Sequence, residues 1–187
     1  MYPSGVLVRT RLDELISSLP ERLARFGPPG LKACIVEGDP DPGIKEKLEL
    51  RQYSDNWCLL AVEGSEELST LLVECLVRAE PVSELVSCRY VPEAGEYGYA
   101  FFRDGELLES FECRGPSMET INFISELRKV PLHSILRASE FMSDSMKLLG
   151  VQPESGKERK GAKTLIRVDL PGKKTFWQLL LGAVSKR

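Results

Sequence analysis

The residues best suited to chemistry in this sequence are five cysteines and one histidine. The cysteines stand at positions 34, 58, 75, 88 and 113, each within an apolar run, and no CxxC pair or Cys/His cluster occurs. Metal centres need closely spaced thiolates or imidazoles. The spacing therefore predicts buried free thiols in a reducing compartment, with a single disulfide or a reactive thiol as the alternative. We expect no metal and no cofactor.

The only histidine, His133, follows a proline in the segment Val130-Pro131-Leu132-His133-Ser134. It has no carboxylate partner nearby in the sequence, and the GxSxG, GxGxxG and GxxxxGK[ST] motifs are absent. The pattern is typical of a residue at a helix boundary or on the surface. The alternative is an enzyme or small-ligand binder whose site assembles from distant residues around His133, with Arg89 or Tyr90, because an imidazole titrates near neutral pH.

A second candidate for function is an aromatic row beside a predicted hairpin. Asp104-Gly105 separates two apolar, aromatic-rich runs, which is typical of a two-residue turn. That turn places Phe102 opposite Leu107 and, further along, Tyr99 opposite Ser110, Phe101 opposite Leu108 and Gly98 opposite Phe111. Alternation then gathers Tyr97, Tyr99 and Phe101 on one face. This face either packs beneath a helix or forms an open binding surface.

Glutamates surround the aromatic row, and together they suggest a surface for a basic protein partner. Aromatic side chains supply affinity at the centre of an interface, while acidic ones steer a basic partner toward it. The candidate partner-binding residues are Tyr97, Tyr99, Phe101, Glu96, Glu109 and Glu112.

The net charge of −3 hides an uneven distribution. Residues 1–149 carry 16 basic and 25 acidic side chains, whereas residues 150–187 carry 9 basic and 3 acidic ones. The basic end rests against its own acidic body or binds a polyanion, for which the candidates are Lys157, Arg159, Lys160 and Lys163. Because the acidic body would repel phosphates, nucleic-acid binding is only the third hypothesis.

Helical spacing predicts helices over residues 10–26, capped by Thr10, and over residues 65–79. Two more are predicted, one opening at Pro116-Ser117 and one ending near Gly150. Strands are expected over 31–37, 47–53, 57–62 and 164–170, with 57–62 as a central strand that is apolar on both faces, and a meander of strands is expected over 85–114. The order of elements predicts an α+β fold, a mainly antiparallel sheet built from hairpins with helices packed on it.

We expect three parts along the chain: an acidic globular domain over residues 1–153, a mobile polar loop over 154–163, and a basic extension over 164–187 that packs on the same domain. The apolar segment 176–184 suits either the core or a contact between two copies, which leaves a homodimer open. No apolar run is long enough to span a bilayer, and the N-terminus lacks a secretory signal pattern. These features favour a cytoplasmic protein without a membrane partner.

The run Trp57-Cys58-Leu59-Leu60-Ala61-Val62-Glu63-Gly64 precedes a helix, and Tyr97-Gly98-Tyr99-Ala100-Phe101-Phe102-Arg103-Asp104-Gly105 forms a hairpin. Over residues 45–150 this arrangement resembles small uncharacterised bacterial α+β proteins of the toxin-immunity type. The resemblance implies a cytoplasmic protein that acts by covering the surface of a partner. The leading hypothesis from the sequence is thus a non-enzymatic protein-interaction module.

Overall fold

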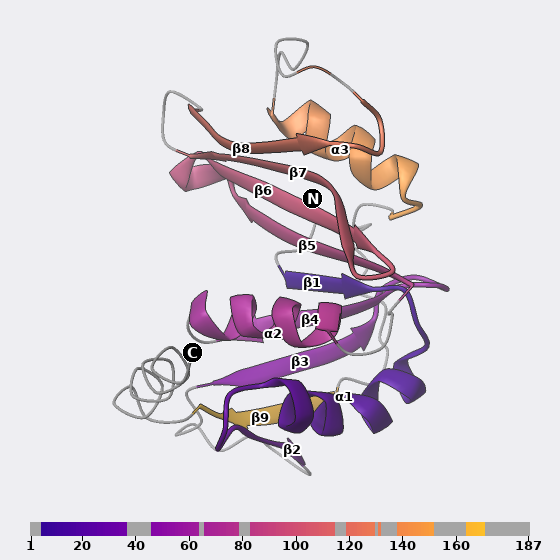
Figure 1. The fold of residues 1–187 in the computed structure, drawn as a ribbon, viewed down its shortest axis with the longest axis vertical. Helices are drawn as coiled ribbons and strands as arrows, with labels where there is room; N and C mark the ends of the chain where they lie inside the picture. Colours follow the sequence, from indigo (N-terminus) through magenta and orange to yellow (C-terminus); the bar gives the residue numbers. More distant parts are fainter. Residues whose placement is uncertain are drawn as a thin grey trace, which may run out of the picture.

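The computed structural model describes residues 5–36, 46–63, 66–78, 83–114, 119–129, 131, 138–151 and 164–170. Its central feature is one nine-stranded sheet with the order β2-β9-β3-β4-β1-β5-β6-β7-β8, and every pairing in it is antiparallel. Figure 1 shows helices packed against this sheet. The predicted α+β class is confirmed.

The first half of the sheet joins segments that lie far apart in the sequence. Its strands are β1 (Gly5–Val8), β2 (Lys32–Val36), β3 (Lys47–Gln52), β4 (Cys58–Glu63) and β9 (Thr164–Asp169). The short strand β1 was not predicted, and it lies between β4 and β5. The late strand β9 lies between β2 and β3 and pairs with both of them.

The second half is a meander of four strands, β5 (Glu84–Val91), β6 (Glu96–Arg103), β7 (Glu106–Arg114) and β8 (Glu119–Ser125), with a short 3-10 helix, η1 (Pro92–Ala94), between β5 and β6. The predicted turn between β6 and β7 is confirmed, because Asp104 and Gly105 have positive φ angles of 50° and 83°.

The register predicted for this hairpin is correct only next to the turn. Arg103 pairs with Glu106 and Phe102 with Leu107, but a β-bulge then shifts the register, so that Phe101 pairs with Glu109. Tyr99 consequently pairs with Phe111 rather than with Ser110, and Gly98 pairs with Glu112 rather than with Phe111. The predictions for Phe101, Tyr99 and Gly98 are wrong because the extra residue of a bulge leaves no sign in the alternation of nearby side chains.

The helix predicted to open at Pro116-Ser117 is also wrong. Residues 119–125 form β8, which pairs with β7 along its length. The apolar residues at 118, 121, 124 and 127 have a spacing that suits a helix, yet Thr120, Ile121 and Ile124 are β-branched and favour a strand. The neighbouring edge of β7 pairs with this segment along its length, whereas a helix this short is only marginally stable by itself.

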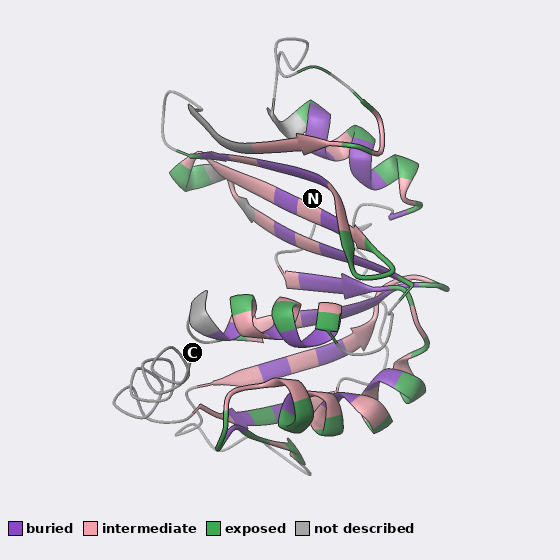
Figure 2. Ribbon diagram, viewed as in Figure 1, coloured by how far each residue is buried: buried purple, intermediate pink, exposed green. Residues whose placement is uncertain are grey.

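In the residues that the structure describes, three α-helices cover the sheet: α1 (Leu12–Phe26), α2 (Glu66–Arg78) and α3 (Ala138–Leu148). Leucines of α1 and α2 share one buried cluster with Val6, Val8 and Leu60, and we call this side of the sheet the α1/α2 face. Phe141, Met142 and Met146 of α3 share a second cluster with residues that alternate with the first, such as Leu7 and Leu59, on the α3 face. Figure 1 shows α3 at the β8 end of the sheet, α1 at the β2 end and α2 beside β4, and Figure 2 shows that each helix has a buried side and an exposed side.

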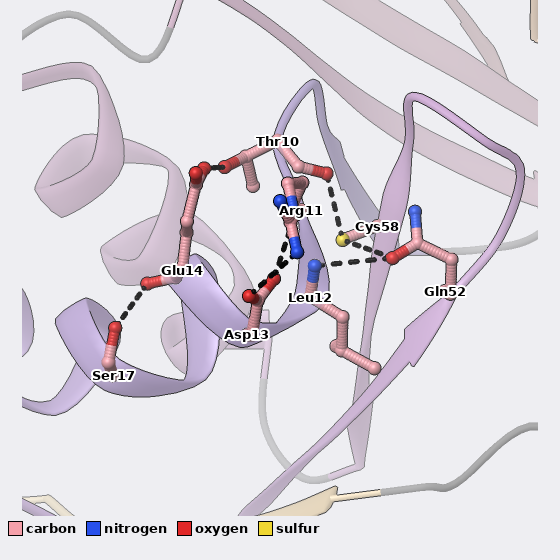
Figure 3. A network of polar contacts seen from close by, with 8 residues as sticks. All are labelled: Thr10, Arg11, Leu12, Asp13, Glu14, Ser17, Gln52 and Cys58. Carbon is pink, nitrogen blue, oxygen red and sulfur yellow. Dashed lines mark hydrogen bonds and ion pairs between the residues drawn. The ribbon is translucent and has the colours of Figure 1, made fainter.

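The start of α1 depends on a residue of β3 (Figure 3). The predicted cap Thr10 is not the N-cap. That position is taken by Arg11, whose side chain makes no capping bond, and the Thr10 hydroxyl instead donates to Glu14. Gln52 supplies the missing acceptor, since its Oε1 receives the Leu12 amide at 3.2 Å. The helix then continues through Pro20 without a break.

The C-terminal end of α3 is capped at Gly150, as the sequence predicted. Gly150 has a φ of 72°, its amide donates to Lys147, and the Val151 amide donates to Met146. This pair of bonds is a Schellman cap. His133, Lys157, Arg159, Lys160, Lys163 and residues 176–184 lie outside the described residues.

Candidate ligand-binding site

A cavity of about 450 Å³ opens on the α1/α2 face above β5, β6 and β7. Cavities of this size are typical of small-ligand sites. The helix α2 lines one side with Ser69 and Thr70, while Gly5 of β1 and Val62 of β4 complete that wall. The sheet itself forms the floor.

Small side chains make the floor deep. One row of paired residues across the three strands consists of Ser87, Ala100 and Ser110. The adjacent row consists of Arg89, Gly98 and Glu112. Interior strand positions usually carry β-branched or aromatic residues. Four small residues at neighbouring positions therefore leave a hollow that the sheet does not fill.

Ser110 is the most informative residue of the floor. Its exposed fraction is only 3%, and its Oγ has no hydrogen-bond partner in the structure. A buried hydroxyl without a partner costs about 1–3 kcal/mol. Ser110 lines the cavity, but its Oγ itself has almost no accessible surface, so a ligand seated there supplies the partner only when the side chain turns toward the cavity.

Gly98 is not required by the backbone or by close packing. Its φ lies outside the left-handed region, and a Cβ placed on it would meet Arg89, Glu112 and Phe111 atoms at 3.8 Å, an ordinary contact distance. Glycine in the interior of a strand weakens it and often marks a place where a ligand approaches the backbone. Here it leaves open the centre of a ring of charges.

Two ion pairs form this ring. Arg89 contacts Glu96 through Nη2 at 2.7 Å and Nε at 2.8 Å. Arg114 contacts Glu112 through Nη2 at 2.6 Å and Nε at 2.9 Å. All four side chains are partly exposed and line the cavity, so two positive and two negative groups alternate around Gly98.

The opposite face of the same strands carries the predicted aromatic row, and α3 covers it. Tyr99 and Phe101 are 4% and 0% exposed, and both belong to the cluster that contains Phe141, against which Tyr97 also packs. Of the two alternatives for this face, the structure shows the packed one. Figure 2 shows buried segments along β6 on this part of the sheet.

Glu109, the third acidic residue of the predicted partner-binding set, lies inside this packed layer. It is 1% exposed, accepts the Tyr99 hydroxyl, and accepts Arg128 Nε at 2.9 and 3.1 Å. The Arg128 guanidinium also lies 4.0 Å from the centre of the Phe141 ring. Burial, together with the hydrogen bond to Glu109, raises the pKa of Tyr99. This network fastens the turn after β8 to the sheet and to α3.

Glu96 and Glu112 are the members of the predicted set that line the cavity rim, whereas the side chain of Tyr97 packs on the opposite face. Sequence reasoning missed Ser110, Gly98 and Arg114 as site residues. The run of small residues in β6 was visible, but the bulge in β7 hid which residues stand beside it. The predicted register, which lacked the bulge, placed Ser110 opposite Tyr99, whereas in the structure Ser110 pairs with Ala100.

The cysteines are free, as predicted, but only four are buried, because Cys34 is exposed in β2. Burial raises the pKa of Cys58 and of Cys75 to about 11, with the acidic neighbours of each adding to the effect, and burial alone raises the pKa of Cys88 to about 12. These three thiols therefore stay protonated at neutral pH and are poor nucleophiles. Within the described ranges, no three His, Cys, Asp or Glu side chains are arranged to hold a metal ion.

No family model matches the chain, and no characterised protein or solved structure shows significant similarity to it. In the part of the chain that the structure describes, no helix is long and apolar enough to cross a membrane.

Proposed function

We propose that this protein is a non-enzymatic binding protein and that the cavity over β5, β6 and β7 holds a small polar ligand. The observation that carries the proposal is the unpaired, buried Ser110 hydroxyl in a hollow of small residues with a charged rim. Such a hollow costs stability, because it forgoes packing and leaves a polar atom without a partner. Ligand binding gives a physical reason for both losses.

The side chains that line the cavity favour binding over catalysis. The arginines and glutamates of the rim are held in ion pairs, and the Cys88 thiol points to the opposite face, into the cluster under α3. Hydroxyls, guanidinium groups and carboxylates at fixed positions recognise a polar molecule through hydrogen bonds and charge.

The proposal is tested by screening polar fragments against the labelled protein and following the backbone amide resonances of Gly98 and Ser110. Binding fragments should shift these resonances and raise the midpoint of thermal unfolding. The variant Gly98→Val fills the hollow and should abolish both effects. Glu106→Val, an exposed position of β7 outside the cavity, is the matched control and should bind as the wild type does. A screen in which no fragment shifts these resonances would refute the proposal.

A protein partner is the second candidate, favoured by the position of Glu96 and Glu112 on the open rim. A basic partner would be steered by these carboxylates, as the sequence suggested. In a capture experiment with host lysate, Glu112→Gln should then reduce recovery of one defined basic protein, whereas Glu106→Gln should not. Equal recovery by the two variants would reject this candidate.

A further inference from the structure

We propose that the ligand of the cavity is a zwitterion of the α-amino acid type. The inference rests on the proposed ligand-binding function and names the chemical class of the ligand. Its basis is the alternation of charge around Gly98, together with the buried Ser110 hydroxyl beside it.

The four charged groups stand around Gly98 in the order Arg89, Glu96, Arg114, Glu112. The residue pairs Arg89–Gly98 and Gly98–Glu112 place the arginine and the glutamate on opposite sides of the glycine in one row. Adjacent strands are about 4.8 Å apart, so the two Cα atoms are roughly 10 Å apart. A molecule lying over Gly98 thus has a guanidinium on one side and a carboxylate on the other.

The balance of charge disfavours ligands whose charges are all of one sign. A simple anion would bind Arg89 or Arg114 but would stand beside two carboxylates, and a simple cation would stand beside two guanidinium groups. A like charge at close range disfavours the charged form of the ligand. A molecule with a carboxylate and an ammonium group a few ångströms apart can place its carboxylate toward an arginine and its ammonium group toward a glutamate.

The floor of the cavity offers room and polar groups for the rest of such a molecule. Ser110 can donate to or accept from a polar group of the ligand, and Ser87 and Ala100 leave room in the same row for its side chain. The walls contain more hydroxyls, from Ser69 and Thr70 of α2. The cavity therefore carries polar groups along its depth as well as at its rim.

The test measures the affinity of each of the common L-α-amino acids for the full chain, from the shifts of the Gly98 and Ser110 amide resonances. For each amino acid that binds, the matching amine and the matching acid without the amino group are titrated. For serine these are ethanolamine and 3-hydroxypropanoate. Both analogues should bind at least about tenfold more weakly, since each loses one charge-assisted interaction.

Ser110→Ala should weaken binding of the amino acid about tenfold without lowering the midpoint of thermal unfolding of the free protein, since the hydroxyl has no partner there. An analogue that binds as tightly as its parent amino acid would overturn the inference. So would a result in which polar fragments shift the Gly98 and Ser110 resonances but no amino acid does, and the small-ligand function would then survive. If neither amino acids nor fragments shift them, both proposals fail.

Discussion

At the scale of single residues, the site is defined by what two positions lack. Gly98 has no side chain in a strand whose backbone and neighbours would accept one, and the Ser110 hydroxyl has no partner in a setting that buries it. Both are choices that a sheet selected for stability alone would avoid. At these two residues we therefore expect a change that stabilises the fold to weaken ligand binding.

Gly98→Val tests whether the residue that favours ligand binding lowers the stability of the fold. Valine favours strands, and its Cβ finds ordinary contact distances at this position, so the free energy of unfolding should stay the same or rise by up to about 1 kcal/mol. Chemical denaturation of the variant and of the wild type gives the comparison. A loss of 2 kcal/mol or more would show that packing requires the glycine.

Arg128 is expected to be important for stability, although it lies on the face of the sheet opposite the cavity. Its removal leaves Glu109, which is 1% exposed, as a buried charge without its guanidinium partner. Arg128→Ala should therefore cost about 3–5 kcal/mol in the free energy of unfolding. Tyr99→Phe removes only a hydroxyl donor to the same carboxylate and should cost about 1 kcal/mol. Equal losses in urea titrations would contradict this assignment.

We expect the carboxyl group of Glu84 to make the stability of the protein depend on pH. Burial by itself raises the pKa of this carboxyl, but hydrogen bonds from Arg9, at 2.5 Å, and Arg103, at 2.8 Å, outweigh burial and lower the pKa below its usual value. A lowered pKa in the folded state gives stability that is present above the unfolded value, about 4.5, and is lost as the pH falls through the folded value.

Glu84→Gln should accordingly be less stable than the wild type at neutral pH, and the gap should shrink steadily as the pH falls below about 4.5. Thermal midpoints measured across this range provide the test. A gap that stays constant down to the lowest pH would mean that the charge of Glu84 contributes nothing.

At the scale of elements, α1 is fixed by a contact from β3. Gln52 accepts the Leu12 amide and donates to the carbonyls of Ser54 and Trp57, at 2.6 and 3.1 Å. The Cys58 thiol lies within reach of the same Oε1 and of the Thr10 carbonyl, as Figure 3 shows. One amide side chain thus ties together the start of a helix and the turn between two strands.

Gln52→Ala should cost about 2 kcal/mol in the free energy of unfolding, the upper end for a lost helix cap. Thr10→Ala is the matched control, because the threonine hydroxyl bonds only an exposed glutamate, and its cost should stay within about 0.5 kcal/mol. If Thr10→Ala cost more free energy of unfolding than Gln52→Ala, Thr10 rather than Gln52 would be the residue that caps the helix.

The elements also show what the sequence could predict. Patterns carried by neighbouring residues were correct, as in the Asp104-Gly105 turn and the Gly150 cap, because φ > 0 is a local demand. Features set by a distant partner were missed. The bulge in β7, the strand β8 and the capping by Gln52 all depend on residues that only the sheet brings together. The candidate site needs the correct register of three strands, so its recognition had to await the structure.

At the scale of the whole molecule, helices cover different faces in the two halves of one continuous sheet. The helices α1 and α2 pack on the α1/α2 face, mainly over the β2 half, whereas α3 packs on the other face over the β8 half (Figure 1). The cavity lies where α2 stops covering the meander, with one wall from the helix and a floor from the sheet. The site is therefore a consequence of the staggered arrangement of the helices.

The continuity of the sheet depends on β9, the last strand in the described part of the chain. Among the described residues β2 pairs only with β9, and β9 in turn pairs with β3. Ile166 and Val168 of β9 are 0% and 2% exposed in the same cluster as the leucines of α1. A strand from the end of the sequence thus joins β2 to the rest of the molecule, a connection of the non-local kind that slows folding.

Ile166→Ala tests this dependence. The loss of a fully buried side chain should cost about 2–5 kcal/mol, and amide hydrogens of β2 should lose protection from exchange before those of β5 and β6 do. Leu165→Ala is the control, because Leu165 is only partly buried and lies on the opposite face of β9, and it should cost less. If instead the amides of β2 and β6 lose protection together in Ile166→Ala, the two halves of the sheet unfold as one unit. The cavity over β5, β6 and β7 would then share its stability with the distant edge of the sheet, and ligand binding there should protect β2 as well.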